Sequence, residues 1–302
     1  MKTDIYLYGQ VLMTRSLLLK GDFPALDTYG ELERKFYLTG GETGTCGTVL
    51  DSLGCACRLD GNYLGRLTKQ PICDFYAGKN IDLSLMVYDD TFDGEEDCVL
   101  IDRTTRTCFG QFGAYFDDPI HRWRMPKAED LAGCKTAGID PFFPGTSDEV
   151  AKLCVSLGIP YVTIDCPWDG YLHQHSAINA VSNEYISSNY AGEDRAQVFE
   201  RFKAASEGLT IFTLGSKDIL YGRKGQETKH FTPYHVQVES TLGAGDTFKA
   251  GCVYALHHGM NDEEAVSFAA ATAASACMRF PIPLNPPTLE RVKAVQAGKT
   301  TL

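Results

Sequence analysis

The chain has 302 residues, of which 44% are hydrophobic, so it can form one large or two modest domains with a full core. Its formal net charge of −11, without a basic run, argues against nucleic acid as a partner. No stretch reaches the roughly 18 uninterrupted apolar residues of a membrane span, so we expect no membrane partner. The 11 cysteines lack a CxxC pair and zinc-ligand spacing, which favours reduced core thiols in a cytoplasmic protein.

The chain begins with a predicted buried strand over residues 4–13. A signal peptide is the alternative, but Gly9, Gln10 and Arg15 interrupt any apolar segment, and no small-residue cleavage site follows. Small and apolar residues at helical spacing next predict a helix over residues 45–53, which ends before a glycine.

The region that follows departs from helical patterns. Residues 84–116 are strand-like, and the segments 99–102 and 107–112 are expected to pair as a hairpin. The stretch 14–39 is also extended and has few helix signals. We expect these two regions to form a small β-sheet lid inserted in a single domain that spans residues 1–302, because no repeat or long linker divides the chain.

The second half of the chain alternates helices with buried strands. A helix over residues 148–157 is expected to be capped at Ser147 and to end at Gly158. The remaining elements are a strand over 160–165, a helix over 193–207 and a strand over 209–214. This alternation predicts an α/β fold in which helices flank a central, mostly parallel sheet.

The segment Ser-Thr-Leu-Gly-Ala-Gly-Asp-Thr-Phe-Lys-Ala-Gly, residues 240–251, opens an apolar helix. Gly243 and Gly245 allow a sharp turn and the close approach of a ligand. Backbone amides at the start of the helix, including that of Ala244, would form an anion site beside the positive end of the helix dipole. Asp246 would then accept a proton from a hydroxyl that attacks a bound phosphate. The alternative is a glycine-rich helix start with Asp246 as a capping charge.

This segment resembles the second signature of the ribokinase/PfkB carbohydrate kinase family, D-T-x-G-A-G-D-x-F-x-A-G. The resemblance extends to Thr213-Leu-Gly-Ser-Lys217, which looks like a nucleotide-phosphate loop, and to the small-residue helix 268–278 beside the adenine site. It implies a ribokinase-like α/β fold with a β-lid, ATP and Mg²⁺ as cofactors, and phosphorylation of a hydroxymethyl group on a sugar or sugar acid. It also suggests a homodimer formed through the lid.

The resemblance implies roles for further residues. Nucleotide binding is expected at Thr213, Gly215, Ser216, Lys217, Asn183 and Thr272, and an indirect magnesium contact, through water, at Glu184. Acceptor binding is expected at Thr14, Gly40, Gly41, Glu42 and Thr45, and two further acceptor contacts at Arg106 and Asp140. For Arg106, a solvated strand face is the alternative, and for Asp140, a turn before Pro141.

Five positions depart from the family pattern. Thr14 stands where an aspartate commonly binds two substrate hydroxyls, and Glu42 and Thr45 replace a lysine and an asparagine after the double glycine. Ser240 replaces an aspartate that helps to bind a monovalent cation, and Ile186 occupies the acid position of an Asn-x-x-Glu motif. The sequence therefore predicts an intact transfer centre with an atypical acceptor pocket.

Other functions remain open at this point. A nucleoside kinase is the nearest alternative within the family, and a ligand-binding protein that has lost catalysis is an alternative from another class. A nicotinamide-dependent dehydrogenase would also use Gly243-x-Gly245, and Glu263 lies at a suitable distance, but Phe248 replaces the third glycine of its fingerprint.

Overall fold

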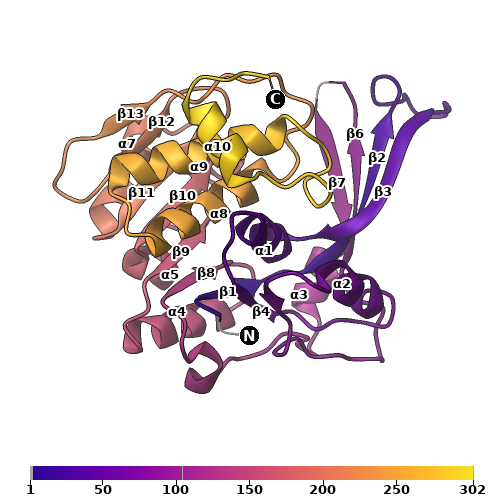
Figure 1. The fold of residues 1–302 in the computed structure, drawn as a ribbon, viewed down its shortest axis with the longest axis horizontal. Coiled ribbons are helices and arrows are strands. Elements are labelled where there is room, and N and C mark those ends of the chain that lie inside the picture. Colours follow the sequence, from indigo (N-terminus) through magenta and orange to yellow (C-terminus); the bar gives the residue numbers. More distant parts are fainter. Residues whose placement is uncertain (1–2, 104, 302) are drawn as a thin grey trace.

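Two β-sheets organise residues 3–103 and 105–301, which are the residues that the computed structural model describes (Figure 1). From one edge to the other, the large sheet contains β13 (Lys229–Phe231), β12 (Ile219–Gly222), β11 (Leu209–Thr213), β10 (Ile178–Ser182), β9 (Tyr161–Ile164), β8 (Thr136–Ile139), β1 (Ile5–Gly9), β4 (Cys57–Gly61) and β5 (Ile81–Asp82). Its strands are parallel from β11 to β5, whereas β12 and β13 are antiparallel.

The small sheet, which we call the lid, stands beside one end of the large sheet (Figure 1). Its strands in order are β3 (Leu32–Gly40), β2 (Leu12–Leu19), β6 (Glu96–Ile101) and β7 (Arg106–Gly110). β6 and β7 form the predicted antiparallel hairpin, and β6 also pairs with β2 in parallel. An α/β fold with a mostly parallel sheet and a small β-sheet is therefore confirmed.

Helices cover both faces of the large sheet, and alternating side chains of the strands define the two cores. Ile5 and Leu7 of β1 pack in one core, and Tyr6 and Tyr8 in the other, because successive side chains of a strand point to opposite faces. The first core is covered by α1 (Glu42–Ser52), α8 (Ala244–His257), α9 (Asp262–Cys277) and α10 (Leu289–Gln296). The opposite face carries α4 (Thr146–Ser156), α5 (Tyr171–His175), α6 (Asn183–Asn189) and α7 (Arg195–Ala205). Three short helices lie in connections: α2 (Lys69–Tyr76), α3 (Phe112–Asp117) and η1 (Ala128–Leu131).

The first predicted strand, residues 4–13, is divided between the two sheets. β1 ends at Gly9, and the chain enters the lid at Leu12. The reason is a change of hydrogen-bond partners: the carbonyl of Gln10 accepts the amides of Thr43 and Gly44, both at 3.1 Å. This junction also fixes the start of α1, which begins three residues earlier than the expected helix at 45–53.

The predicted cap of the helix at 148–157 is wrong. α4 begins at Thr146 after Gly145, whose φ of 71° ends the preceding turn. Ser147 lies inside the helix, and its hydroxyl donates instead to the carbonyl of Asp140 at 2.7 Å. The other expected elements are confirmed as β9, α7 and β11, with ends that differ by one or two residues.

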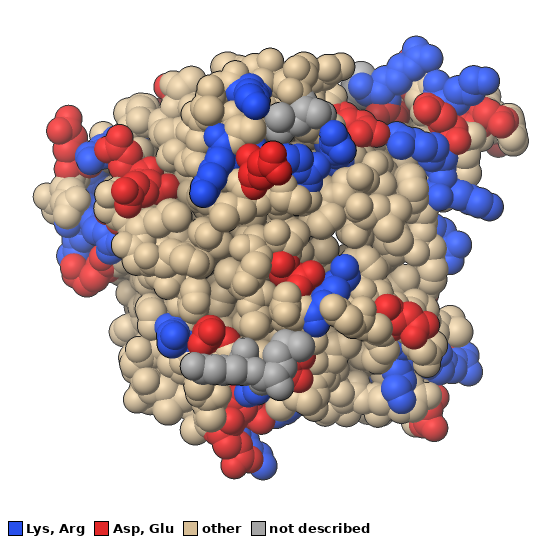
Figure 2. Space-filling model, in the orientation of Figure 1, with Lys and Arg blue, Asp and Glu red and all other residues tan. Residues whose placement is uncertain are grey.

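Charged side chains of both signs are interspersed over the face drawn in Figure 2, with several Lys and Arg side chains over the lid. All 11 cysteines are free thiols, and six of them are buried. Within the described ranges, no helix is both long and apolar enough to cross a membrane.

Candidate active site

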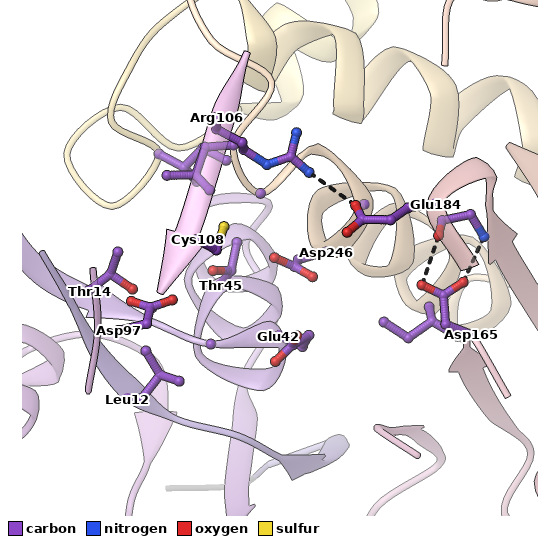
Figure 3. A pocket seen from close by; sticks show the side chains of 18 of the residues that line it. Leu12, Thr14, Glu42, Thr45, Asp97, Arg106, Cys108, Asp165, Glu184 and Asp246 are labelled. Atoms are coloured by element: carbon purple, nitrogen blue, oxygen red, sulfur yellow. Dashed lines mark hydrogen bonds and ion pairs between the residues drawn. The ribbon is translucent and has the colours of Figure 1, made fainter. Parts of the chain in front are cut away.

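A cavity of about 520 Å³ lies between the lid and the ends of the strands of the large sheet. Its walls come from the inner face of the lid, the starts of α1 and α8, and the carboxyl ends of β9, β10 and β11. Ligands of open α/β sheets bind at this edge because the helix N-termini meet there. Its charged lining residues are Glu42, Asp97, Arg106, Asp165, Glu184 and Asp246 (Figure 3).

The start of α8 presents unpaired backbone amides to this cavity. Gly243 adopts a left-handed conformation, with φ 75°, immediately before the helix. The amide of Ala244 donates to the carbonyl of Thr241 at 3.2 Å, so it is already occupied. The amides of Gly245 and Asp246 have no acceptor among the described residues, and the space in front of the Gly245 Cα is open. Two free donors at a helix N-terminus can hold a phosphate.

Asp246 lies beside these amides and lines the cavity (Figure 3). Burial and, to a smaller extent, the nearby Asp140 carboxylate raise the pKa of its carboxyl to about 6, although the Lys249 ammonium lowers it. A carboxylate with this pKa is largely ionised at neutral pH and is a stronger base than an exposed aspartate. Such a group can accept a proton from an alcohol that becomes acidic as its bond to phosphorus forms.

Asp140, a predicted acceptor contact, does not line the cavity. Its side chain is fully buried and forms an ion pair with the fully buried ammonium of Lys249. Its other carboxylate oxygen accepts the Thr43 hydroxyl at 2.7 Å and the Gln10 amide at 3.3 Å. A Cβ at Gly9 would overlap this carboxylate, so the absence of a side chain there makes room for it. Asp140 thereby connects the first turn of α1 to the second turn of α8.

The side of the cavity formed by the lid and α1 is called the acceptor lobe here. Gly40 and Gly41 line it, and a Cβ at Gly40 would overlap the Thr14 hydroxyl. Thr14 pairs with Asp97 across β2 and β6, so both side chains lie on the inner face of the lid (Figure 3). Glu42, the first residue of α1, points into the same lobe from below.

Glu42 and Asp97 both have raised pKa values. Burial, followed by the carboxylates of Asp246 and Asp140, raises the pKa of Glu42 well above its ordinary value. Burial raises the pKa of Asp97 to about 6, although a hydrogen bond from Thr14 lowers it. One carboxylate oxygen of Asp97 is buried without a hydrogen-bond partner among the described residues. Thr45, which is also buried, completes the polar lining at the start of α1.

Arg106 extends from β7 across the top of the cavity (Figure 3). Its guanidinium lies 3.7 Å from the Glu184 carboxylate and 3.3 Å from the Thr241 hydroxyl. The side chain therefore extends from the lid toward α6 and the loop before α8, and away from Thr14 and Asp97.

The opposite side of the cavity includes part of the predicted nucleotide site. Thr213, at the end of β11, lines the cavity. Gly215, Ser216 and Lys217 form an exposed turn directly after it. Asn183 begins α6 next to the cavity-lining Ser182.

Thr272, a predicted nucleotide contact, does not line this cavity. It is fully buried, and its hydroxyl donates to the Phe268 carbonyl at 2.7 Å within α9. A Cβ at Gly251 would come within 3.3 Å of the Thr272 hydroxyl, which places this residue in the contact between α8 and α9.

Asp165 was not predicted as a site residue, although it follows β9 as directly as Asp140 follows β8. Its carboxylate accepts the amide of Ser182 at 2.6 Å and the Ser182 hydroxyl at 3.0 Å. Burial is the main reason why the pKa of Asp165 is raised. Asp165 and Glu184 lie together on the nucleotide side (Figure 3).

These two carboxylates fit Mg²⁺ that is bound mainly by phosphates and water. Mg²⁺ commonly takes one or two carboxylates together with phosphate oxygens. The described residues contain no group of three or more His, Cys, Asp or Glu side chains that could hold a metal ion on its own.

The sequence of residues 178–280 matches the pfkB family carbohydrate kinase pattern. This match covers about a third of the chain. The matched region contains β10, β11 and the start of α8, all of which contribute residues to the lining of the cavity. No curated protein sequence matches the chain.

Solved structures share the fold of this chain over nearly its full length. Ribokinase from Arabidopsis thaliana, complexed with ribose and ATP, has a TM-score of 0.80 at 18% identity and covers 98% of this chain and 99% of its own. Ribokinase from Thermotoga maritima has a TM-score of 0.79 at 20% identity, with coverage of 98% and 99%. Burkholderia thailandensis nucleoside kinase, in complex with inosine, has a TM-score of 0.76 at 14% identity, with coverage of 97% and 98%. These likenesses establish a ribokinase-like fold.

Proposed function

We propose that this chain transfers the γ-phosphoryl group of ATP to a hydroxymethyl group of a sugar-like acceptor. The observation that carries the proposal is the start of α8, which faces a cavity between the two sheets. There Asp246 stands beside two backbone amides that have no acceptor among the described residues. A base and an anion site next to each other are the two elements that phosphoryl transfer requires most.

In the proposed reaction, the acceptor lies in the acceptor lobe with its hydroxyl next to Asp246. The hydroxyl oxygen forms a bond to the γ-phosphorus while the bond between that phosphorus and the ADP oxygen breaks. The hydroxyl proton passes to the Asp246 carboxylate, and ADP leaves with the electron pair of the broken bond. The amides of Gly245 and Asp246 donate to the equatorial oxygens, on which negative charge is concentrated during transfer.

ATP would extend from α8 toward Thr213 and the exposed turn at Gly215, Ser216 and Lys217. Asp165 and Glu184 would contact Mg²⁺ directly or through water. Mg²⁺ supplies charge neutralisation of the phosphates when it is bound. Arg106 would add a positive charge near the phosphate oxygens, since its guanidinium reaches the loop before α8.

The test is ADP release with Mg·ATP over a panel of ketoses, aldoses, keto-deoxy acids and nucleosides. We expect at least one acceptor to be phosphorylated, and Asp246→Asn to reduce turnover by roughly 100-fold or more while ATP binding persists. Glu33→Gln, at an exposed position on β3, is the matched control for loss of one carboxylate.

The outcomes separate the candidates. A nucleoside as the preferred acceptor would identify a nucleoside kinase on the same catalytic site. Activity of Asp246→Asn near that of the unmodified protein would refute Asp246 as the base. ATP binding without turnover of any acceptor would favour a non-catalytic binding protein.

A further inference from the structure

The charges that line the cavity are strongly unbalanced. Five carboxyl side chains, those of Glu42, Asp97, Asp165, Glu184 and Asp246, line it within the described residues, but Arg106 is the only lysine or arginine that does so. Arg106 already lies beside Glu184 on the nucleotide side. Lys249 lies behind Asp246, fully buried, and its ammonium is paired with Asp140.

The imbalance is greatest in the acceptor lobe. Glu42 and Asp97 point into it from opposite sides, α1 and the lid, and Asp246 lies between them and the nucleotide side (Figure 3). The lobe is lined by no basic side chain of the described chain other than Arg106, which turns away toward α6. Binding of Mg·ATP would add further negative charge to the same cavity.

Carboxylates in a partly desolvated lobe are costly when they lack a hydrogen-bonded cation. One buried carboxylate oxygen of Asp97 accepts no hydrogen bond from the described residues, so the lobe leaves this acceptor unsatisfied. Neutral hydroxyls would supply hydrogen bonds but would leave the charge in place. A protonated amine would supply hydrogen bonds and a compensating positive charge. Charge-assisted hydrogen bonds to carboxylates are about twice as strong as neutral ones.

We propose that the acceptor is a polyhydroxylated compound that carries a protonated amine, with Glu42 and Asp97 as the residues that recognise it. This inference rests on the proposed phosphotransfer function and specifies its substrate class. The amine takes no part in the reaction: it pairs with the two carboxylates and positions the hydroxymethyl group beside Asp246. Acceptors with a phosphate or carboxylate would be repelled by the same residues, so sugar acids are disfavoured.

The test compares acceptors that differ only in charge. D-glucose, D-glucosamine and D-gluconate form one set, and D-fructose with 1-amino-1-deoxy-D-fructose forms a second. We expect the amine of at least one set to have a kcat/KM at least 10-fold above that of its neutral partner, and gluconate to be the poorest of its set. Glu42→Gln and Asp97→Asn should each reduce this preference by about 10-fold, which corresponds to the loss of about 1.4 kcal/mol of discrimination. Glu33→Gln should leave it unchanged.

A binding measurement keeps the inference testable where turnover is slow. Each compound is added to the Asp246→Asn variant with Mg·ATP, and the rise of Tm is recorded. The amines should raise Tm more than their neutral partners, and Asp97→Asn in the same background should abolish the difference. Equal or stronger effects of neutral or acidic compounds would overturn the amine inference.

The two proposals fail in different ways. A neutral sugar or gluconate that is phosphorylated faster than its amine partner, in a reaction that Asp246→Asn abolishes, would support the kinase proposal and refute the amine inference. Binding of the amines through Glu42 and Asp97, without phosphorylation of any compound in either set or in the larger panel, would support amine recognition and refute the kinase proposal.

Discussion

The transfer centre and the acceptor lobe face the same cavity, but they are built in different ways. The transfer centre is one turn of α8 that rests on fully buried groups, among them Lys249 and Asp140. The acceptor lobe is assembled from β2, β6, β7 and α1, which are distant in the sequence and partly exposed. We therefore expect substitutions beneath α8 to affect transfer to every acceptor, and substitutions in the acceptor lobe to alter which acceptor is used.

The largest effect is expected from breaking the buried ion pair with Lys249→Met. Removal of one partner leaves the Asp140 charge buried and unpaired, which typically costs about 3–5 kcal/mol. The pKa of Asp246, now about 6, should rise because Lys249 lowers it. Since the base must be ionised, the acid limb of the kcat/KM profile should move to higher pH for all acceptors. Urea unfolding and a pH–rate profile measure the two effects.

Asp140→Asn and the double variant Asp140→Asn/Lys249→Met sharpen this prediction. Asp140 raises the pKa of Asp246, so its neutralisation should move the acid limb to lower pH. The double variant removes both charges, and its acid limb should return near that of the unmodified protein. Acid limbs that coincide in all four proteins would show that the pair does not act on Asp246.

A smaller effect is expected from Gly9→Ala. The added Cβ would overlap the Asp140 carboxylate and crowd the Thr43 hydroxyl, so the network that joins α1 to α8 must shift. Overpacking of this kind costs about 1–3 kcal/mol. Gly113→Ala in α3 is the matched control, because its Cβ meets no atom within 4 Å and it should be neutral or slightly stabilising. Equal unfolding free energies for the two variants would contradict the packing argument.

Ionisation of Asp246 also predicts a gain in stability for Asp246→Asn. The carboxyl pKa is raised from 3.8 to about 6 in the folded protein, so its proton binds more tightly there than in the unfolded chain. The free energy of unfolding therefore falls as pH rises from 3.8 to about 6. At pH 7 we expect the variant to be more stable by on the order of 1 kcal/mol, and this advantage should disappear below about pH 4. Urea unfolding at both pH values measures it.

The smallest effect is expected from potassium. Ser240 replaces the aspartate that helps to bind a monovalent cation in similar kinases, and its hydroxyl accepts the Leu242 amide at 3.2 Å. We expect little change in kcat/KM when KCl replaces choline chloride at constant ionic strength. A saturable activation by KCl would show that the cation site is retained.

The start of α8 could be predicted because the residues that form it are contiguous. The spacing of Gly243, Gly245 and Asp246 predicts a helix start with an adjacent base, and the helix begins there. Asp97 could not be found in the same way, since its role depends on β6 pairing with β2, more than 75 residues earlier in the chain. Alternation on the lid hairpin places Arg106 and Cys108 on one face, but it does not say which face meets the cavity.

Asp140 and Asp165 show a second limit of the sequence. Both follow a buried parallel strand, and a rule based on strand ends treats them alike. Only the packing of α8 distinguishes them: Lys249 binds Asp140 and holds it in the interior, whereas Asp165 accepts two hydrogen bonds from Ser182 and lines the cavity. A lysine inside an otherwise apolar helix segment was the available signal for a buried acid partner.

The junction at Gln10 has a consequence for how such a protein can change over evolutionary time. A single carbonyl receives two amides of α1 at the point where the chain leaves the large sheet for the lid, so the frame of the catalytic turn is closed before the lid begins. Mutations in β2, β3, β6 and β7 can therefore accumulate without disturbing that frame. The lid is the part of the molecule on which selection can try new substrates while the old chemistry continues.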